Sequence, residues 1–425
     1  MGSALARLLL TDAGRVAERT GVALELVKVA VRSASKERDV PGVERLITTD
    51  AFGVVRDPAI DVVVEVMGGI SPARDLVLEA LRSGKPVVSA NKELLANHGG
   101  ELWDAASAAG VDLLFEASVA GGVPLIRALR ESLAGERIHR VMGIVNGTTN
   151  YILTRMEEQG DSYDDVLRDA QELGLAERDP TADVEGHDAA AKAAILASLA
   201  FGSDIVDADV HREGITGVSA ADVAYASRLG YSVKLLAIAE LVDGGPEISV
   251  RVHPAMVPRA HPLAAVRGAF NAVFVEGAVS GELMLYGRGA GGGPTASAML
   301  GDLVDASRNL LAGAPSPAPK RTSTTVRSQG DMRSAFYLSM DVADRPGVLA
   351  AVAKIFGDHD VSIRAMEQVG LAEEARLIFL THVAREGDLL ATIDTLRQHQ
   401  AVDRVSGVLR VIGERDGDGG GAGAP

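Results

Sequence analysis

The chain has 425 residues, of which 47% are hydrophobic and 24% charged, which is enough material for two or three well-filled cores. Its formal net charge of -16 disfavours binding to nucleic acid or to an anionic membrane surface, and no apolar run is long enough to span a bilayer. The absence of cysteine excludes disulfides, thiolate nucleophiles and cysteine-bound zinc, and it fits a protein of the reducing cytoplasm.

The first ten residues resemble the second half of a dinucleotide-binding loop. Gly2 reads as the last glycine of the phosphate-binding turn, and residues 3–10 read as the helix that follows it. Such a loop directs helix N-terminal amides at a cofactor pyrophosphate, but the usual first strand and first two glycines are not in this sequence. Two explanations remain open: the true start lies upstream, or the chain is impaired in binding its cofactor.

Short apolar runs then alternate with helical segments as far as residue 122. Strands are predicted at 22–31, 61–67, 86–89 and 111–115, and a helix at 72–83. This rhythm predicts a parallel, doubly wound sheet, with the first strand missing. Ligands of such sheets bind at the carboxyl ends of the strands, where Arg32, Gly68, Lys92 and Glu116 fall.

The rest of the chain predicts two further units. Residues 123–311 mix helices (163–173, 188–201) with strands (141–145, 247–252), as in an α+β domain. A linker follows at 312–334, and it includes the proline-rich run 314–320. Residues 335–413 read β-α-β-β-α-β, a compact ferredoxin-like unit, and the glycine-rich tail 414–425 is expected to be disordered.

Residues 174–192 hold the densest group of ionisable side chains. Asp188 and Lys192 lie four residues apart on one face of a helix predicted to start near Glu185, and alanines surround the lysine. Partial desolvation would lower the pKa of Lys192 and ease proton exchange near neutral pH. The five acidic residues between 177 and 188 suit recognition of an ammonium group. The alternative is an exposed ion pair of little energetic value.

Three loops are further candidates. Residues 146–151 (NGTTNY) follow a predicted strand, where a glycine lets a small ligand approach the backbone; the alternative is an ordinary β-turn. Residues 116–124 offer one carboxylate and a run of carbonyls, which suit a hard cation; the alternative is a plain interdomain loop. Residues 286–295 form a second glycine-rich loop that is suited to cradling a cofactor.

Five ordered segments carry a family resemblance. They are SANKELLA (89–96), FEASVAGGVP (115–124), NGTTNYIL (146–153), LGLAERDPTADVEGHDAAAK (173–192) and YGRGAGGGPTASA (286–298). Together they resemble homoserine dehydrogenase over nearly the whole chain. The C-terminal unit, with DRPGVL at 344–349, looks like an ACT domain.

The resemblance implies interconversion of L-homoserine and L-aspartate 4-semialdehyde in threonine, methionine and isoleucine biosynthesis. It implies that Lys192 is the proton donor, Asp188 its partner and Lys92 a second active-site lysine. The substrate residues that it implies are Glu177 and Asp183 for the amino group, and Gly147 and Thr148 for the pocket wall.

The resemblance also implies the cofactor and a cation. Gly2, Gly174 and Gly289 match glycines that line the cofactor or the pocket, while Arg32 and Lys36 after the second strand favour NADP over NAD. A structural sodium ion is implied at Glu116, Val119, Gly121 and Val123.

Regulation and assembly are implied as well: an amino-acid effector, threonine in this family, at the ACT domain, and a homodimer or homotetramer. One competing interpretation is a catalytically impaired homologue that acts as an amino-acid-binding regulatory protein. Another is a different ACT-bearing dehydrogenase of amino-acid synthesis, but such families do not combine NGTTN with the 177–192 segment.

Overall fold

The computed structural model describes residues 1–316, 321–322, 324–371 and 374–413, so the predicted tail and part of the predicted linker lie outside the described residues. The chain divides into two compact units. Unit 1 consists of Met1–Val141, Ala190–Val210 and Phe270–Thr324, and unit 2 of Met142–Ala189, His211–Ala269 and Thr325–Pro425. Strand β6 (Ile138–Ile144) and helix α10 (His187–Phe201) each cross from one unit to the other.

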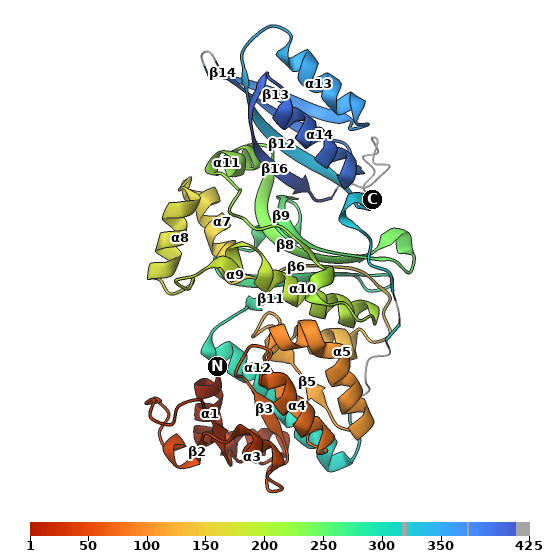
Figure 1. Cartoon of the computed structure of the whole chain (residues 1–425). Helices are drawn as coiled ribbons and strands as arrows, with labels where there is room; N and C mark the ends of the chain where they lie inside the picture. Colours follow the sequence, from red (N-terminus) through yellow and green to blue (C-terminus); the bar gives the residue numbers. More distant parts are fainter. Residues whose placement is uncertain (317–320, 323, 372–373, 414–425) are drawn as a thin grey trace. The chain divides into compact units, whose positions relative to one another are not determined.

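The Rossmann part of unit 1 contains two parallel sheets (Figure 1). Strands β1 (Val29–Ala30) and β2 (Ile47–Thr48) form one, and β3 (Val63–Glu65), β4 (Val87–Ser89) and β5 (Leu113–Leu114) form the other. Within the described residues no ladder joins the two sheets. This is the arrangement of a doubly wound sheet without its first strand, as the sequence predicts.

The long strand predicted at 22–31 is wrong in extent, because only Val29 and Ala30 are in a strand. Residues 22–28 have no regular structure, and their apolar side chains are used for packing instead. Val22 packs with Val16 and Val304, and Leu26 packs with the cluster around Val40. The apolar pattern therefore marks burial here rather than ladder pairing.

Helices cover the sheets of unit 1. Helix α1 (Gly2–Thr11) packs along α12 (Gly292–Ala312), and their side chains share a core with β4 and β5. The remaining elements of unit 1 are α2 (Ala13–Thr20), η1 (Val43–Leu46), α3 (Ala51–Arg56), α4 (Ala73–Arg82), α5 (Lys92–Ala109), η2 (Glu116–Ser118), α6 (Leu125–Arg127), the π-helical turn η3 (Ala128–Ser132), η4 (Asp207–Asp209), and the antiparallel pair β10 (Phe270–Gly277) and β11 (Gly281–Arg288).

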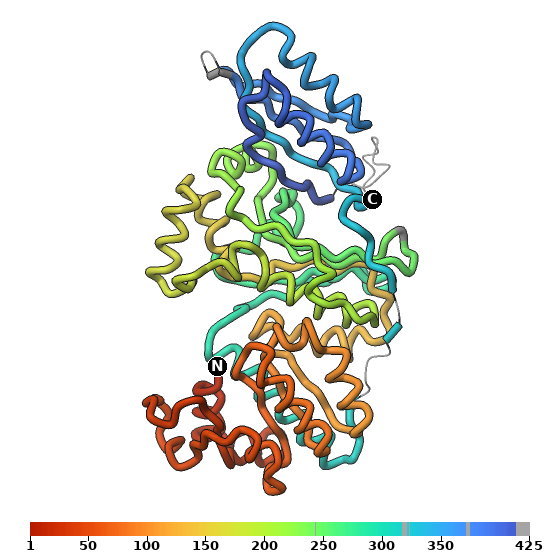
Figure 2. The backbone as a smooth tube through the Cα atoms, viewed as in Figure 1, coloured from red at the N-terminus to blue at the C-terminus, as the bar shows by residue number. Residues whose placement is uncertain are grey.

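In unit 2 the strands follow the order β8-β9-β16-β12-β14-β13 within a larger sheet (Figure 1). These strands are β8 (Tyr231–Leu241), β9 (Ile248–Pro258), β12 (Arg333–Ala343), β13 (Ile363–Leu371), β14 (Glu374–Thr381) and β16 (Val402–Val411). Figure 2 traces the same backbone as a tube coloured from the N-terminus to the C-terminus. Two short strands, β7 (His211–Arg212) and β15 (Ala384–Arg385), pair with β9 and β12 respectively.

The helices of unit 2 begin at well-defined caps. Ser162 and Ser219 accept hydrogen bonds from backbone amides at the starts of α8 (Tyr163–Glu172) and α11 (Ala220–Arg228), as serine N-caps do. The other helical elements are α7 (Gly147–Gln159), α9 (Thr181–Val184), η5 (Val242–Gly244), η6 (Pro262–Ala265), η7 (Gln329–Asp331), α13 (Val348–Asp358) and α14 (Glu386–Gln398). No helix in the described part of the chain is long and apolar enough to cross a membrane.

The C-terminal β-α-β-β-α-β unit has the predicted element order and its own core around Phe356, Phe379 and Leu396. Strand pairing also joins this unit to the rest of unit 2. Strand β16 pairs in parallel with β9, at Arg410 opposite Ala255 and Val411 opposite Met256. Helix α11 also docks on it, since Asp222 accepts hydrogen bonds from Tyr337 and Ser339.

Candidate active site

Asn146 joins the two acidic segments of the predicted substrate site. It follows β6 in an extended conformation and caps α7, with its side-chain oxygen accepting the Thr149 amide at 2.9 Å. Its amide nitrogen Nδ2 donates to Asp183 Oδ1 at 2.7 Å and to Asp188 Oδ2 at 2.8 Å. The residues after β6 thus start a helix directly instead of forming a β-turn, and the cap holds two carboxylates near each other.

Asp188 and Lys192 lie on α10, which begins at His187 rather than near Glu185. Asp188 is only 6% exposed, Lys192 is half-buried, and the alanines around them are buried. An exposed surface pair is therefore excluded. A buried carboxylate beside a half-buried lysine on an apolar helix is an environment suited to proton transfer.

The other predicted substrate residues of unit 2 lie at the start of α7 and in the segment that follows α8. Thr148, the second residue of α7, donates from Oγ1 to the carbonyl oxygen of Leu175 at 2.8 Å. Gly174, two residues after the end of α8, has a φ of 70°, and the side chain of Gln171 donates to the carbonyl oxygen of Glu177 at 3.1 Å. Asp183 is half-buried and Glu177 is exposed, so both carboxylates can be reached by a small ligand.

Position 147 requires a glycine because it lies in close contact with the turn after residue 265. A Cβ at this position would lie 2.8 Å from the carbonyl oxygen of Ala269. The same turn is fixed by Lys234, whose Nζ donates to Val266 O at 2.6 Å and to Asn150 Oδ1 at 3.3 Å. Burial lowers the pKa of Lys234 to about 8. Lys234 therefore links the first turn of α7, at Asn150, to the turn at Val266.

In unit 1, a second asparagine cap positions Lys92. Asn91 follows β4 and accepts the Leu94 amide at 3.1 Å, while its Nδ2 donates to Gly69 O at 2.7 Å. Ser89 donates to the buried Glu65 at 2.9 Å. Lys92, the first residue of α5, is therefore held at the carboxyl ends of β3 and β4, where ligands of doubly wound sheets bind.

Two more predicted cofactor positions border the same sheets. Gly2 starts α1, and a Cβ there would stand 3.2 Å from Val66 just after β3. Arg32 and Lys36 are exposed in the loop after β1. Arg38 stabilises this loop by donating to Lys36 O at 2.6 Å and to Ser33 O at 3.1 Å.

The two glycine-rich loops of unit 1 pack backbone to backbone although they are far apart in sequence. The amide of Gly122 donates to Arg288 O at 3.1 Å, and a Cβ at Gly121 would overlap Gly289 O. A Cβ at Gly289 would in turn overlap the side chain of Asn271. Val119, Gly121 and Val123 are all buried, and Gly121 lies against the carbonyl oxygen of Gly289.

Glu116, the one carboxylate of the predicted cation site, is 6% exposed. Its two oxygens accept the amides of Ile126 at 2.9 Å and Arg127 at 2.8 Å, and burial raises its pKa. No group of three or more His, Cys, Asp or Glu side chains among the described residues is arranged to hold a metal ion. A cation here would depend mainly on carbonyl oxygens.

Asn91, Asn146 and Lys234 support the site but were not singled out as site residues from the sequence. For the asparagines a signal exists, because each stands between an apolar strand and a helix, the position of an N-cap. Lys234 has a weaker signal: it is a lone charge in the apolar run 233–239.

Family models match three parts of the chain. They are described as homoserine dehydrogenase, NAD binding domain (residues 1–116), homoserine dehydrogenase (residues 124–304) and ACT domain (residues 336–400). A homoserine dehydrogenase of Corynebacterium glutamicum is 48% identical over 420 residues, which cover 98% of this chain and 94% of the relative. One of Mycobacterium tuberculosis is 49% identical over 423 residues, covering 97% and 96%.

Solved structures agree. The crystal structure of a homoserine dehydrogenase from Thiobacillus denitrificans superposes with a TM-score of 0.89 at 41% identity, covering 96% of this chain and 95% of the other. A hyperthermophilic archaeal homoserine dehydrogenase in complex with NADPH gives a TM-score of 0.61 at 29% identity, covering 73% and 95%. The chain therefore belongs to the homoserine dehydrogenase family, oxidoreductases, and it combines a Rossmann NAD-binding domain, a catalytic domain and a C-terminal ACT domain.

Proposed function

We propose that the protein interconverts L-homoserine and L-aspartate 4-semialdehyde within amino-acid biosynthesis in the cytoplasm. The observation that carries this proposal is the Asn146 cap, which gathers Asp183 and the buried Asp188 one turn before Lys192. One carboxylate is left accessible for a substrate ammonium, and the other is placed to orient a proton donor.

The chemistry divides between cofactor and protein. A bound nicotinamide cofactor supplies a hydride to the aldehyde carbon, or accepts it in the reverse direction. Lys192 gives the proton that the new alkoxide oxygen needs, and takes it back when homoserine is oxidised. Asp188 orients the Lys192 ammonium, while Lys92 stabilises negative charge on the reacting oxygen.

Binding of the amino acid falls to other side chains. Glu177 and Asp183 pair with the substrate ammonium, and Gly147 and Thr148 form the wall that leaves room for its backbone atoms. Gly174 keeps space open for the cofactor or the pocket, and Gly289 borders it while leaving room for the side chain of Asn271 behind it. Exclusion of water at the reacting carbon follows from the alanine-rich face of α10.

A dinucleotide fits the residues present in unit 1. The N-terminus of α1 offers amides beside the end of β3, and Gly68 and Gly69 both adopt positive φ there, which leaves the backbone open to phosphate. Arg32 and Lys36 would hold a 2′-phosphate, so we propose NADP rather than NAD as the preferred cofactor.

A monovalent cation also fits its loop in donor chemistry. Asn271 is 1% exposed, and its buried Oδ1 has no hydrogen-bond partner among the described residues, beside the loop that contains Gly289. Glu116 together with the carbonyls of Val119, Gly121 and Val123 would complete an oxygen-only set that sodium accepts.

We propose threonine as an inhibitor bound by the ACT domain, and a homo-oligomer as the working form. Strand β11 supports the second point, because it is an edge strand whose side chains are mostly exposed, including Met284 and Tyr286. An exposed apolar edge of this length is usually covered by a partner.

A second candidate is an amino-acid-binding homologue with impaired catalysis. Titration of NADPH fluorescence decides between the two, since tight binding supports the enzyme and absence of binding supports the impaired homologue.

The activity itself is tested by homoserine oxidation with NADP and with NAD, using wild type and Lys192→Ala. We expect Lys192→Ala to lose at least about a thousandfold in kcat with unchanged cofactor affinity, because a general acid–base group is removed. Lys354→Ala, which removes an exposed lysine of α13, is the control. Near-normal turnover in Lys192→Ala would reject the assigned role.

A further inference from the structure

Strands β7 and β16 share one edge of β9. Strand β8 pairs with β9 along its whole length, so both must occupy the opposite edge. Strand β7 pairs at Arg251 and Val252, and β16 takes over at Ala255 and Met256. Glu213 therefore leaves this edge close to the point where Arg410 of the ACT domain joins it.

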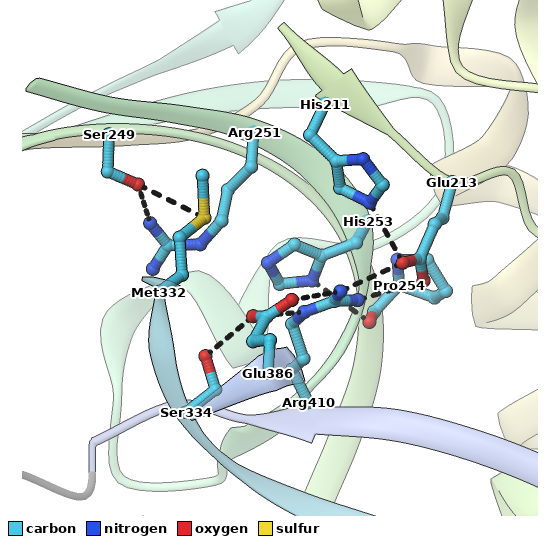
Figure 3. Close-up of polar contacts among 10 residues, drawn as sticks. All are labelled: His211, Glu213, Ser249, Arg251, His253, Pro254, Met332, Ser334, Glu386 and Arg410. Carbon is cyan, nitrogen blue, oxygen red and sulfur yellow. Dashed lines mark hydrogen bonds and ion pairs between the residues drawn. The ribbon is translucent and has the colours of Figure 1, made fainter. Parts of the chain in front are cut away.

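Arg410 is 4% exposed and bonds to two carboxylates at once (Figure 3). Its Nη1 and Nη2 donate to the two oxygens of Glu213, both at 2.8 Å. Its Nε and Nη2 donate to Glu386 at 2.8 and 2.6 Å. Such bidentate pairs fix the relative orientation of their partners as well as their distance. Arg410 thus ties Glu386 of the ACT helix α14 to Glu213 of the catalytic part.

The surroundings leave this arginine little freedom. Phe336 lies 5.5 Å under its guanidinium, and Ser334 donates to Glu386 at 3.0 Å. His253 is fully buried beside it, and burial together with Arg410 and Arg251 holds the pKa of His253 well below its usual value. A neutral His253 adds no competing positive charge. Glu213 has one further partner, His211, whose Nε2 lies 3.0 Å from Glu213 Oε1.

The residues that follow Glu213 contact the segment that contains the proposed substrate residues Asp183 and Asp188. The amide of Ile215 donates to Val184 O at 2.8 Å, and a Cβ at Gly214 would lie 2.7 Å from the Cα of Glu185. The backbone of 213–215 therefore presses on the segment between Asp183 and Asp188. A shift of Glu213 must move that segment or break these contacts.

We propose that the Arg410–Glu213 ion pair is a positioning contact that transmits the state of the ACT domain to the substrate-binding segment 183–188. The proposal rests on the substrate role assigned above to Asp183 and Asp188. The ACT domain has a second contact with the catalytic part, in which Tyr337 donates to Asp222 at 3.0 Å. Asp222 lies in the first turn of α11, and none of the contacts described above connects α11 to segment 183–188.

The test uses the full chain and a double-mutant cycle with Glu213→Gln, Arg410→Met and both together. Glu213→Gln keeps the shape and an acceptor, so it is expected to fold even if loss of Arg410 is too destabilising. Arg404→Met is the matched control, since Arg404 lies on the same strand but pairs with Asp341 within the ACT domain. Tyr337→Phe is the control for general loosening of the domain.

Two quantities are measured: kcat and homoserine KM, and the Kd of L-threonine by calorimetry with and without saturating homoserine. We expect Glu213→Gln and Arg410→Met each to raise the homoserine KM about fivefold or more with kcat within about twofold, and the double variant to be no worse than Arg410→Met. In both single variants, homoserine should change the threonine Kd by a smaller factor than in wild type. Each ligand alters the affinity for the other by the same factor, so a weakened coupling is visible from either side.

A homoserine KM within about twofold of that of Arg404→Met, in both variants, would overturn the proposal, as would an equal rise in Tyr337→Phe. If wild type oxidises no homoserine, the assigned activity fails, and the same comparison of homoserine affinities by calorimetry decides the positioning role. If wild type binds no homoserine either, both conclusions fall. If threonine does not bind, the effector assignment is wrong and the KM comparison alone decides.

Discussion

Gly214 lies against the carbonyl oxygen of Val184, and the next amide, that of Ile215, donates to the same oxygen at 2.8 Å. This contact fixes the distance between the segment after β7 and the short helix α9. Helix α9 contains Asp183, so this backbone contact lies next to the proposed substrate site.

Gly214→Ala is expected to push these segments apart. A methyl group would sit 2.7 Å from the Cα of Glu185, an overlap with main-chain atoms that a rotamer change cannot relieve. We expect a loss of about 1–3 kcal/mol in the free energy of unfolding and a raised homoserine KM. Gly217→Ala is the control, because a Cβ there meets nothing within 4 Å. Equal behaviour of the two variants would contradict the prediction.

Asn146→Asp separates the capping role of Asn146 from its amide donation. Aspartate caps helices as well as asparagine does, so α7 should keep its start. The variant loses both donors to Asp183 and Asp188 and adds a third carboxylate, which repels the other two. We expect kcat/KM to fall by at least about a hundredfold, with circular dichroism unchanged. A variant with nearly full activity would show that capping alone matters.

Glu177→Gln tests the proposed ammonium site. Removing one negative charge while keeping the side-chain shape should raise the homoserine KM by about tenfold and leave the cofactor KM unchanged. Glu172→Gln, an exposed position at the end of α8, should change neither constant. An unaltered homoserine KM in Glu177→Gln would remove this residue from the site.

Arg32→Ala with Lys36→Ala tests cofactor choice. Both side chains are exposed after β1, and the loop that carries them is held by Arg38 rather than by either of them. The double variant should therefore fold normally, raise the KM for NADP by about tenfold or more, and leave the KM for NAD within about twofold. Equal rises for both cofactors would assign these residues to something other than the 2′-phosphate.

Lys234 predicts how stability depends on pH. Its pKa falls from 10.5 to about 8 on folding, chiefly through burial, so the folded chain releases this proton first. Between pH 8 and 10.5 the unfolded chain binds more protons, and this group then makes unfolding less favourable as pH rises, by about 1.4 kcal/mol per pH unit at most. Urea titrations at pH 7 and 9.5 should show wild type gaining stability relative to Lys234→Met. A constant difference would refute the shift.

The sequence predicted the fold well where pattern and packing agree. Helix α13 is found at the predicted residues 348–358, because its apolar spacing and its burial coincide. The strand expected at 22–31 was mostly wrong, since apolar residues there are buried without a ladder partner. The pairing of β16 with β9 was not predictable, because strand order between distant segments leaves no local signal.

The site could be predicted in part for the same reason. The sequence indicated the motif around Asp188 and Lys192 because these two charged residues lie in an alanine-rich helix. The Asn146 bridge depends on a contact between residues 37 and 42 positions apart, and Arg410 reaches Glu213 across 197. Long-range polar partners of this kind are decided by the fold and not by spacing along the chain.

The interlocking of the loops around Gly121 and Gly289 has a genetic consequence. A Cβ at Gly121 collides with the main chain of the other loop at Gly289, so no change of side chain on that loop can restore the fit. In a saturation library the two stretches, separated by more than a third of the gene, should behave as a single intolerant locus. Suppressors of Gly121 variants should arise from shifts of the backbone, whereas variants of Gly289 could be relieved by a smaller residue at Asn271.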